Sequence, residues 1–132
     1  MANKVYVEII PISVKADDSA LKSKLAAQIK EAFEKAIEAS GALTKKAPAD
    51  KKEKGFSLDI DFTLKMKGTE IEGELNIAFS IRPKKAIFGH AKQGAGGSSI
   101  RELDGVMDAI LEKLVPKVIA QLKAQIPKLA DV

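Results

Sequence analysis

The chain has 132 residues, a hydrophobic content of 45% and a formal net charge of +4, which fit one globular domain with an ordinary core (residues 1–132). It contains no cysteine, so disulfides, thiolate metal sites and cysteine nucleophiles are excluded. The first residues lack the apolar run of a secretory signal, and no segment reaches the roughly 18 apolar residues of a membrane span. We therefore expect a cytoplasmic protein without membrane insertion.

Residues 3–14 predict a strand with a bulge. The alternation of apolar side chains slips by one residue between Ile9 and Ile10, which one extra residue in the strand explains. Pro11 cannot donate a hydrogen bond to a neighbouring strand, so at least this end of the strand is expected at a sheet edge.

A helix is predicted next, with an N-cap at Asp17 or Asp18 and a stop at Gly41. Its apolar residues recur every three or four positions along one stripe, with lysines and glutamates opposite. Residues 42–55 have no such period and are rich in lysine, which predicts a mobile loop.

A β-hairpin follows over residues 56–81, because apolar and polar side chains alternate on both sides of Gly68-Thr69. This dipeptide has the Gly-X pattern of a two-residue type II′ turn. The turn pairs apolar residues with apolar residues at four positions: Met66 with Ile71, Phe62 with Leu75, Ile60 with Ile77, and Phe56 with Ile81.

Residues 83–98 are predicted to form a second mobile loop, because they contain most of the glycine-rich stretch FGHAKQGAGGSS (88–99). The stretch lacks the Gly-Lys-Ser/Thr ending of a P-loop and the glycine spacing of a dinucleotide-binding turn. Ser99 and Glu102 match a capping box, so the serines are expected to start the next helix.

The last predicted helix covers residues 100–126, with Pro116 either bending it or starting a new helix. Val115 and Ile119 lie beside the main apolar stripe and widen it. We expect these two residues to support weak self-association or docking of a partner helix. The competing interpretation is that they are buried within the monomer.

The order strand, helix, strand, strand, helix predicts an α+β two-layer sandwich. The simplest arrangement is a three-stranded antiparallel sheet, with spatial order 1-3-2 and two helices on one face. The other face is expected to be polar and solvated. Its Asp59, Asp61 and Glu74 could hold a hard cation, but solvation is the favoured interpretation, so no metal and no cofactor are predicted.

Basic residues are concentrated in segments 42–55 and 82–101, which this topology places side by side, together with the start of the second helix. Such a basic pole is a candidate site for nucleic acid or another polyanion, whereas the alternative is a solvated lysine-rich surface. The two segments hold ten of the 22 basic residues: Lys45, Lys46, Lys51, Lys52, Lys54, Arg82, Lys84, Lys85, Lys92 and Arg101.

No catalytic constellation stands out. The chain has one histidine, and a hydrolase centred on His90 would need Ser98 or Ser99 and Asp104 from the same segment. The first hypothesis is therefore a small non-enzymatic module that acts through protein–protein contacts. The second is an accessory protein that binds anions or nucleic acid through the basic pole.

Overall fold

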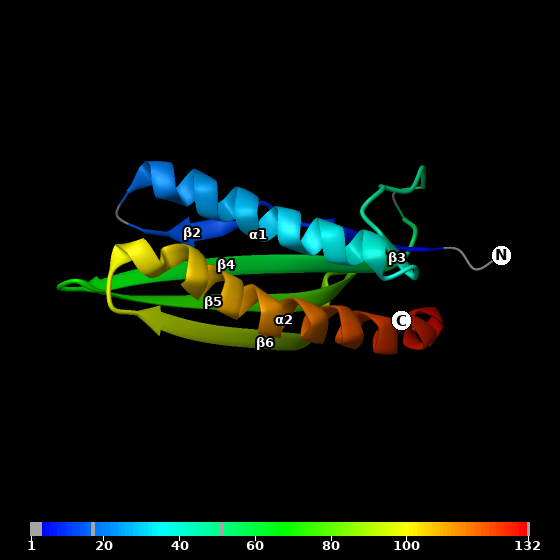
Figure 1. Cartoon of the computed structure of the whole chain (residues 1–132). Helices are drawn as coiled ribbons and strands as arrows, with labels where there is room; N and C mark the ends of the chain where they lie inside the picture. Colours follow the sequence, from blue (N-terminus) through cyan, green and yellow to red (C-terminus); the bar gives the residue numbers. More distant parts are fainter. Residues whose placement is uncertain (1–3, 17, 51, 132) are drawn as a thin grey trace.

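The protein forms two layers, a mixed β-sheet and two long helices that cover one of its faces (Figure 1). The computed structural model describes residues 4–16, 18–50 and 52–131. Short 3-10 helices at Ile100–Glu102 and Ile126–Asp131 flank the second long helix. The strands and long helices are β1 (Val5–Ile9), β2 (Ser13–Lys15), α1 (Ser19–Ala39), β3 (Leu43–Thr44), β4 (Gly55–Lys67), β5 (Glu70–Arg82), β6 (Ala86–Gly97) and α2 (Leu103–Gln125).

The sheet differs from the predicted one in size, order and direction. In the described residues it has six strands in the order β3-β1-β4-β5-β6, with β2 also paired to β4. β1 and β2 run parallel to β4, and only β4, β5 and β6 form an antiparallel meander. The prediction of a three-stranded antiparallel sheet with order 1-3-2 was therefore wrong. α1 carries the chain back so that β4 pairs directly with the first strands, as in other parallel crossovers.

The predicted bulge in the first strand is confirmed. Ile9 lies opposite Leu58 and Val14 opposite Phe62, so the first strand region advances five residues where β4 advances four. The extra residue separates β1 from β2 near Pro11, and it keeps the apolar side chains of both strands on the same face.

The β4–β5 hairpin has the predicted register at all four positions, for example Phe62 opposite Leu75 and Phe56 opposite Ile81. Gly68 has a φ of 62°, which fits the first central residue of a type II′ turn. Because every buried side chain would move to the wrong face after a one-residue slip, this register is strongly specified.

Residues 86–97 form strand β6, where the sequence predicted part of a loop over 83–98. β6 pairs with β5 along its length, from Gly97 opposite Ile71 to Ala86 opposite Ile81. A Cβ atom on Gly97 would lie 2.6 Å from Oε2 of Glu102. The prediction was wrong because glycine usually interrupts a strand, whereas here it lets the strand lie close to its neighbours.

The ends of α1 agree with the prediction. The Asp18 carboxylate accepts a hydrogen bond from the Ala20 N–H at 2.9 Å, and Gly41 follows the helix with a φ of 75°. α2 is one helix that runs through Pro116. At its start, Glu102 accepts from the N–H and hydroxyl of Ser98, and the Ser99 side chain makes no capping hydrogen bond. The predicted capping box of Ser99 with Glu102 was therefore wrong, because Glu102 contacts Ser98 instead.

The core lies between the helices and the inner face of the sheet. Four phenylalanines are fully buried there: Phe33 from α1, Phe56 and Phe62 from β4, and Phe79 from β5. No helix in the described ranges is long and apolar enough to cross a bilayer.

Candidate functional site

The most distinctive surface is the outer edge of β6, the last strand of the sheet on its side (Figure 1). Lys67 and Glu70 flank the two-residue turn, so their backbone groups form a hydrogen-bonded pair. Along the hairpin, hydrogen-bonded pairs then alternate with pairs whose backbone groups point away from each other. Odd-numbered residues of β5 therefore direct their backbone groups toward β6, where their partners are Gly89, Ala91, Gln93, Ala95 and Gly97.

The intervening residues of β6 must direct their N–H and C=O groups away from β5. These four residues, His90, Lys92, Gly94 and Gly96, are all exposed, and we refer to them as the β6 edge. The Gln93 side chain donates a hydrogen bond to the C=O of Gly94 at 3.1 Å. An edge strand of this length, with no proline in it, is a template for pairing with another chain.

Glycines at the β6 edge differ from those that face α2. A Cβ atom on Gly89 would meet the ring of Phe79 at 3.1 Å, so packing requires glycine there. At Gly94 and Gly96 a Cβ atom would reach only backbone oxygens of β5, at 3.4 and 3.2 Å. These two glycines therefore leave the polar face of the sheet open beside the edge.

A short polar network lies next to this opening. The Asn76 amide donates to Glu74 at 3.0 Å, and the Lys92 ammonium lies 3.4 Å from the other oxygen of that carboxylate. The hydrogen bond from Asn76 and the positive charge of Lys92 lower the pKa of Glu74. Glu74 is therefore an anion beside the β6 edge at neutral pH.

The structure divides the predicted basic pole. Loops 42–55 and 82–85 are neighbours as expected, because Arg82 Nη1 donates to the C=O of Glu53 at 3.2 Å. Lys92, however, lies within β6. Arg101 belongs to the 3-10 helix Ile100–Glu102, and this segment precedes α2 at the other end of the molecule (Figure 1). Lys51 lies outside the described residues. The basic end consists of Lys45, Lys46, Lys52, Lys54, Arg82, Lys84 and Lys85.

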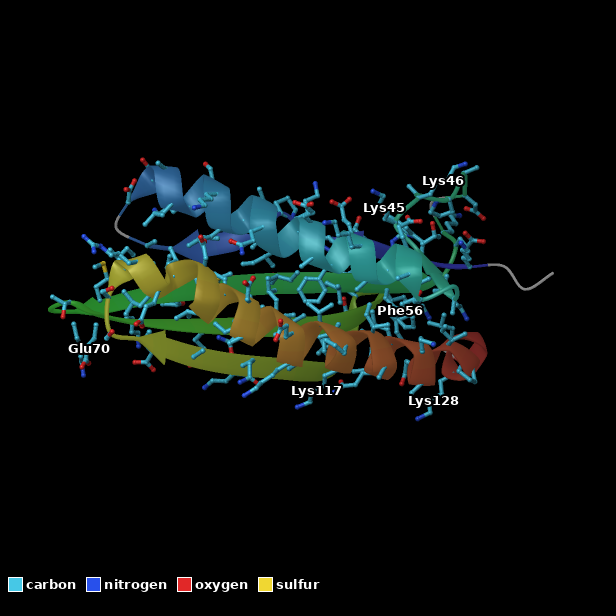
Figure 2. All side chains as sticks on the ribbon, viewed as in Figure 1. Lys45, Lys46, Phe56, Glu70, Lys117 and Lys128 are labelled. Carbon is cyan, nitrogen blue, oxygen red and sulfur yellow. The ribbon has the colours of Figure 1, made fainter. Side chains whose placement is uncertain are left out.

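In the described residues, both long helices begin at the end of the molecule opposite the basic end, contrary to the prediction of a helix N-terminus among the lysines. β6 returns the chain across the sheet, so both long helices end beside these loops (Figure 1). Figure 2 shows Lys45 and Lys46 at this end and Glu70 at the opposite one. Helix C-termini carry partial negative charge, which stabilises nearby lysines but does not attract an anion. Lys45 is also 3.5 Å from Glu34, and Arg82 lies 4.7 Å above the Tyr6 ring.

Val115 and Ile119 pack above a larger sheet than the three-stranded one that the prediction assumed. Val115 is buried, and Ile119 is half-buried against the core. The additional long strand β6 gives α2 more sheet to cover than three strands would, so a wide apolar stripe follows from the fold alone. Whether these residues also contact a partner stays a prediction.

The proposed hydrolase residues do not come together. His90 and Ser98 are eight residues apart on or beside one extended strand, which separates them by about 26 Å. Ser98 is engaged with Glu102, whose pKa is lowered by the Ser98 backbone N–H and hydroxyl. In the described part of the chain, no three histidine or carboxylate side chains group as metal ligands. This covers the cation site considered at Asp59, Asp61 and Glu74.

A broad hollow lies at the end of the sheet where β6 finishes. The hairpin tip and the end of β6 line it, with Leu64, Met66 and Ile71 as its large apolar side chains. Met66 is 48% exposed, because the hairpin extends beyond the part of the sheet that the helices cover. This end adds apolar surface next to the β6 edge.

Comparison with known proteins identifies no matching family model and no matching curated protein. Solved structures do share the fold. A hypothetical protein from Chlamydia trachomatis is 12% identical, with 92% of this chain and 99% of that chain covered and a TM-score of 0.67. A minor lipoprotein from Acinetobacter baumannii is 12% identical over 95% and 93%, with a TM-score of 0.55.

PelC from Paraburkholderia phytofirmans, solved as a dodecamer, is 14% identical over 87% of this chain and 88% of that chain, with a TM-score of 0.58. At these identities the similarity establishes the fold alone. The names of these three proteins indicate no enzymatic activity.

Sequence reasoning missed the β6 edge because it assigned these residues to a loop. One signal was present: at the start of residues 89–97, the polar His90 and Lys92 alternate with Gly89, Ala91 and Gln93, which are small or uncharged. Without large apolar side chains, that alternation did not resemble a strand.

Proposed function

We propose that this chain is a small non-enzymatic interaction module that binds a partner protein by adding a strand to the β6 edge. The observation that carries the proposal is the row of outward N–H and C=O groups at His90, Lys92, Gly94 and Gly96, which continues a long antiparallel meander. Main-chain hydrogen bonds give such strand addition its affinity, and side chains beside the edge give it selectivity.

Two further features support this proposal. Two glycines of the edge lack side chains that would hinder an approaching backbone, and Glu74 and Lys92 provide charges beside it. The similar protein PelC is described as a dodecamer, so this fold occurs in a protein that forms assemblies. We also propose the cytoplasm as the location, and fractionation of the native host tests it against the envelope location suggested by the lipoprotein with the same fold.

A proline at the edge tests the proposal. Gly94→Pro removes an outward N–H without removing a hydrogen bond to β5, and Gly94→Ala is the matched control that keeps the N–H. Peptides selected from a displayed random library on the wild-type protein, immobilised at low density, should bind Gly94→Ala and lose binding to Gly94→Pro. If the selected peptides bind both variants equally, the β6 edge is not the binding site.

Binding of a polyanion at the basic end is the second candidate, favoured by the contact between Arg82 and Glu53 that joins the two lysine-rich loops. The double variant Lys84→Glu/Lys85→Glu should elute from heparin at lower salt than Lys22→Glu/Lys67→Glu, which makes the same charge change at the other end. Equal elution of the two variants would assign the retention to net charge and remove this candidate.

A further inference from the structure

We propose that the partner at the β6 edge is a second copy of this chain, paired antiparallel about Gln93 so that two sheets become one. This inference rests on the proposed function and specifies its partner and register. A two-fold axis through an antiparallel pair places the same patch on both copies, so the edge must be complementary to itself.

Centring the pair on Gln93 gives this complementarity. Lys92 then lies opposite Gly94 of the second copy, and His90 lies opposite Gly96 of the second copy. All four outward residues are used, and each large side chain meets a glycine. These four positions are the ones at which both backbone groups point outward, so every pair can form two hydrogen bonds.

Neighbouring registers fit less well. Centring on Lys92 would place the ammonium groups of the two copies directly opposite each other, which is unfavourable. Centring on Gly94 would place His90 opposite Ser98, which lies beyond the end of β6 at Gly97, and would lose strand pairing. The pattern His-x-Lys-x-Gly-x-Gly therefore favours one register.

The charges of the adjacent strand agree with this register. Glu74 lies opposite Gly94 on the neighbouring strand. Lys92 of the second copy would lie opposite Gly94 on its other side, so only a glycine would separate this lysine from Glu74. Glu72 has the same relation to Gly96 and to His90 of the second copy. Strands are spaced by about 4.8 Å, so extended Glu and Lys side chains can meet across the intervening glycine. The two-fold axis repeats each contact.

The helical layer leaves room for the second copy over part of the edge. A shallow groove runs along the end of β6 beside Ala95 and Gly96, and Glu102, Gly105, Val106 and Ala109 form its helical side. Gly105 and Ala109 are small, so a second strand can approach this part of β6 past them.

A single cysteine tests the register, because the natural chain has none. Gln93 would meet its own counterpart in a non-hydrogen-bonded pair with Cα atoms about 4.5 Å apart, a separation that suits a disulfide. Under mild oxidation, Gln93→Cys should form a covalent dimer. Ala95→Cys is the control. In this register Ala95 lies opposite Ala91 of the second copy, so the two introduced cysteines would be four residues apart along the strand, about 13 Å.

Charge substitutions at Gly94 test the same register without oxidation. Gly94→Lys opposes Lys92 of the second copy and should weaken dimerisation on the order of tenfold in sedimentation equilibrium, whereas Gly94→Glu should not weaken it. The effect on the monomer has the opposite sign, because the introduced lysine would lie beside Glu74 of its own chain, whereas an introduced glutamate would be repelled by that carboxylate. A stability effect therefore cannot imitate the expected result.

The outcomes separate the two proposals. A wild-type protein that stays monomeric up to millimolar concentration, or a Gln93→Cys variant that crosslinks no faster than Ala95→Cys, overturns pairing between copies. If library peptides still bind wild type and Gly94→Ala but not Gly94→Pro, strand addition at the β6 edge stands with a different partner. If that peptide binding is also absent, the proposed function falls as well.

Discussion

Replacing Gly73 with alanine should destabilise the fold, although alanine is normally the better residue in a strand. Gly73 lies on β5 and faces the helices. A Cβ atom there would lie 2.9 Å from Cζ of Phe62 and 3.3 Å from Cδ1 of Ile110. Both neighbours are fully buried, so the strands and α2 must separate to admit the methyl group.

The magnitude follows from two opposing terms. Overpacking a filled core costs about 1–3 kcal/mol. Removing a glycine from a strand returns roughly 0.5–1 kcal/mol. We expect a net loss of about 1–2 kcal/mol, which lowers the melting temperature of a chain of this size by roughly 5 °C.

Thermal and urea unfolding of Gly73→Ala and Gly94→Ala measure this difference. Gly94 is also in the sheet but faces solvent, with only the C=O of Gly73 near its added Cβ atom, at 3.4 Å. Its alanine variant should be as stable as the wild type or slightly more stable. A Gly73→Ala protein that matches or exceeds the wild type in stability would mean that Gly73 does not lie beneath α2.

Three other substitutions test local features of the fold. The Ser98 contacts lower the pKa of Glu102. Its carboxylate therefore stabilises the fold above its unfolded pKa, and this stabilisation is lost as the pH falls through the lower folded pKa. Urea unfolding from pH 6 to 3 should show a smaller loss of stability for Glu102→Gln than for wild type. Asp18→Ala should cost about 1 kcal/mol in the same assay, because Asp18 caps α1, and an unchanged value would argue against the cap. Gly41→Ala should cost about 1 kcal/mol through the positive φ alone, and Gly41→Asn should cost less.

The parts of the fold that the sequence predicted are those with strong local patterns. Alternation on both sides of Gly68 determined the β4–β5 register, and the helical period between Asp18 and Gly41 determined α1. Each of these patterns reflects one buried face and one exposed face of a single element. Such a pattern depends on nearby residues, so it can be recognised without knowing the rest of the fold.

The position of the first strand depended on information that local patterns do not contain. Parallel pairing of β1 with β4 and antiparallel pairing with β5 would bury the same face of the strand. The choice depends on how α1 crosses the sheet and on the presence of β6 at the other edge. The prediction assigned β1 to the side of β5 that β6 occupies.

β6 also explains why the sequence did not predict the β6 edge as a candidate site. From Gly89 to Gly97 its inner face consists mainly of small residues, because α2 packs close above it, and its outer residues are polar or glycine because they border solvent. Over this stretch neither face carries the large apolar side chains by which strands are usually recognised. Once the strand is included, the chain reverses direction once more, the start of α2 moves away from the lysine-rich loops, and the glycines lie along a free edge. The same strand thus weakens the case for anion binding and provides the surface at which we propose strand addition.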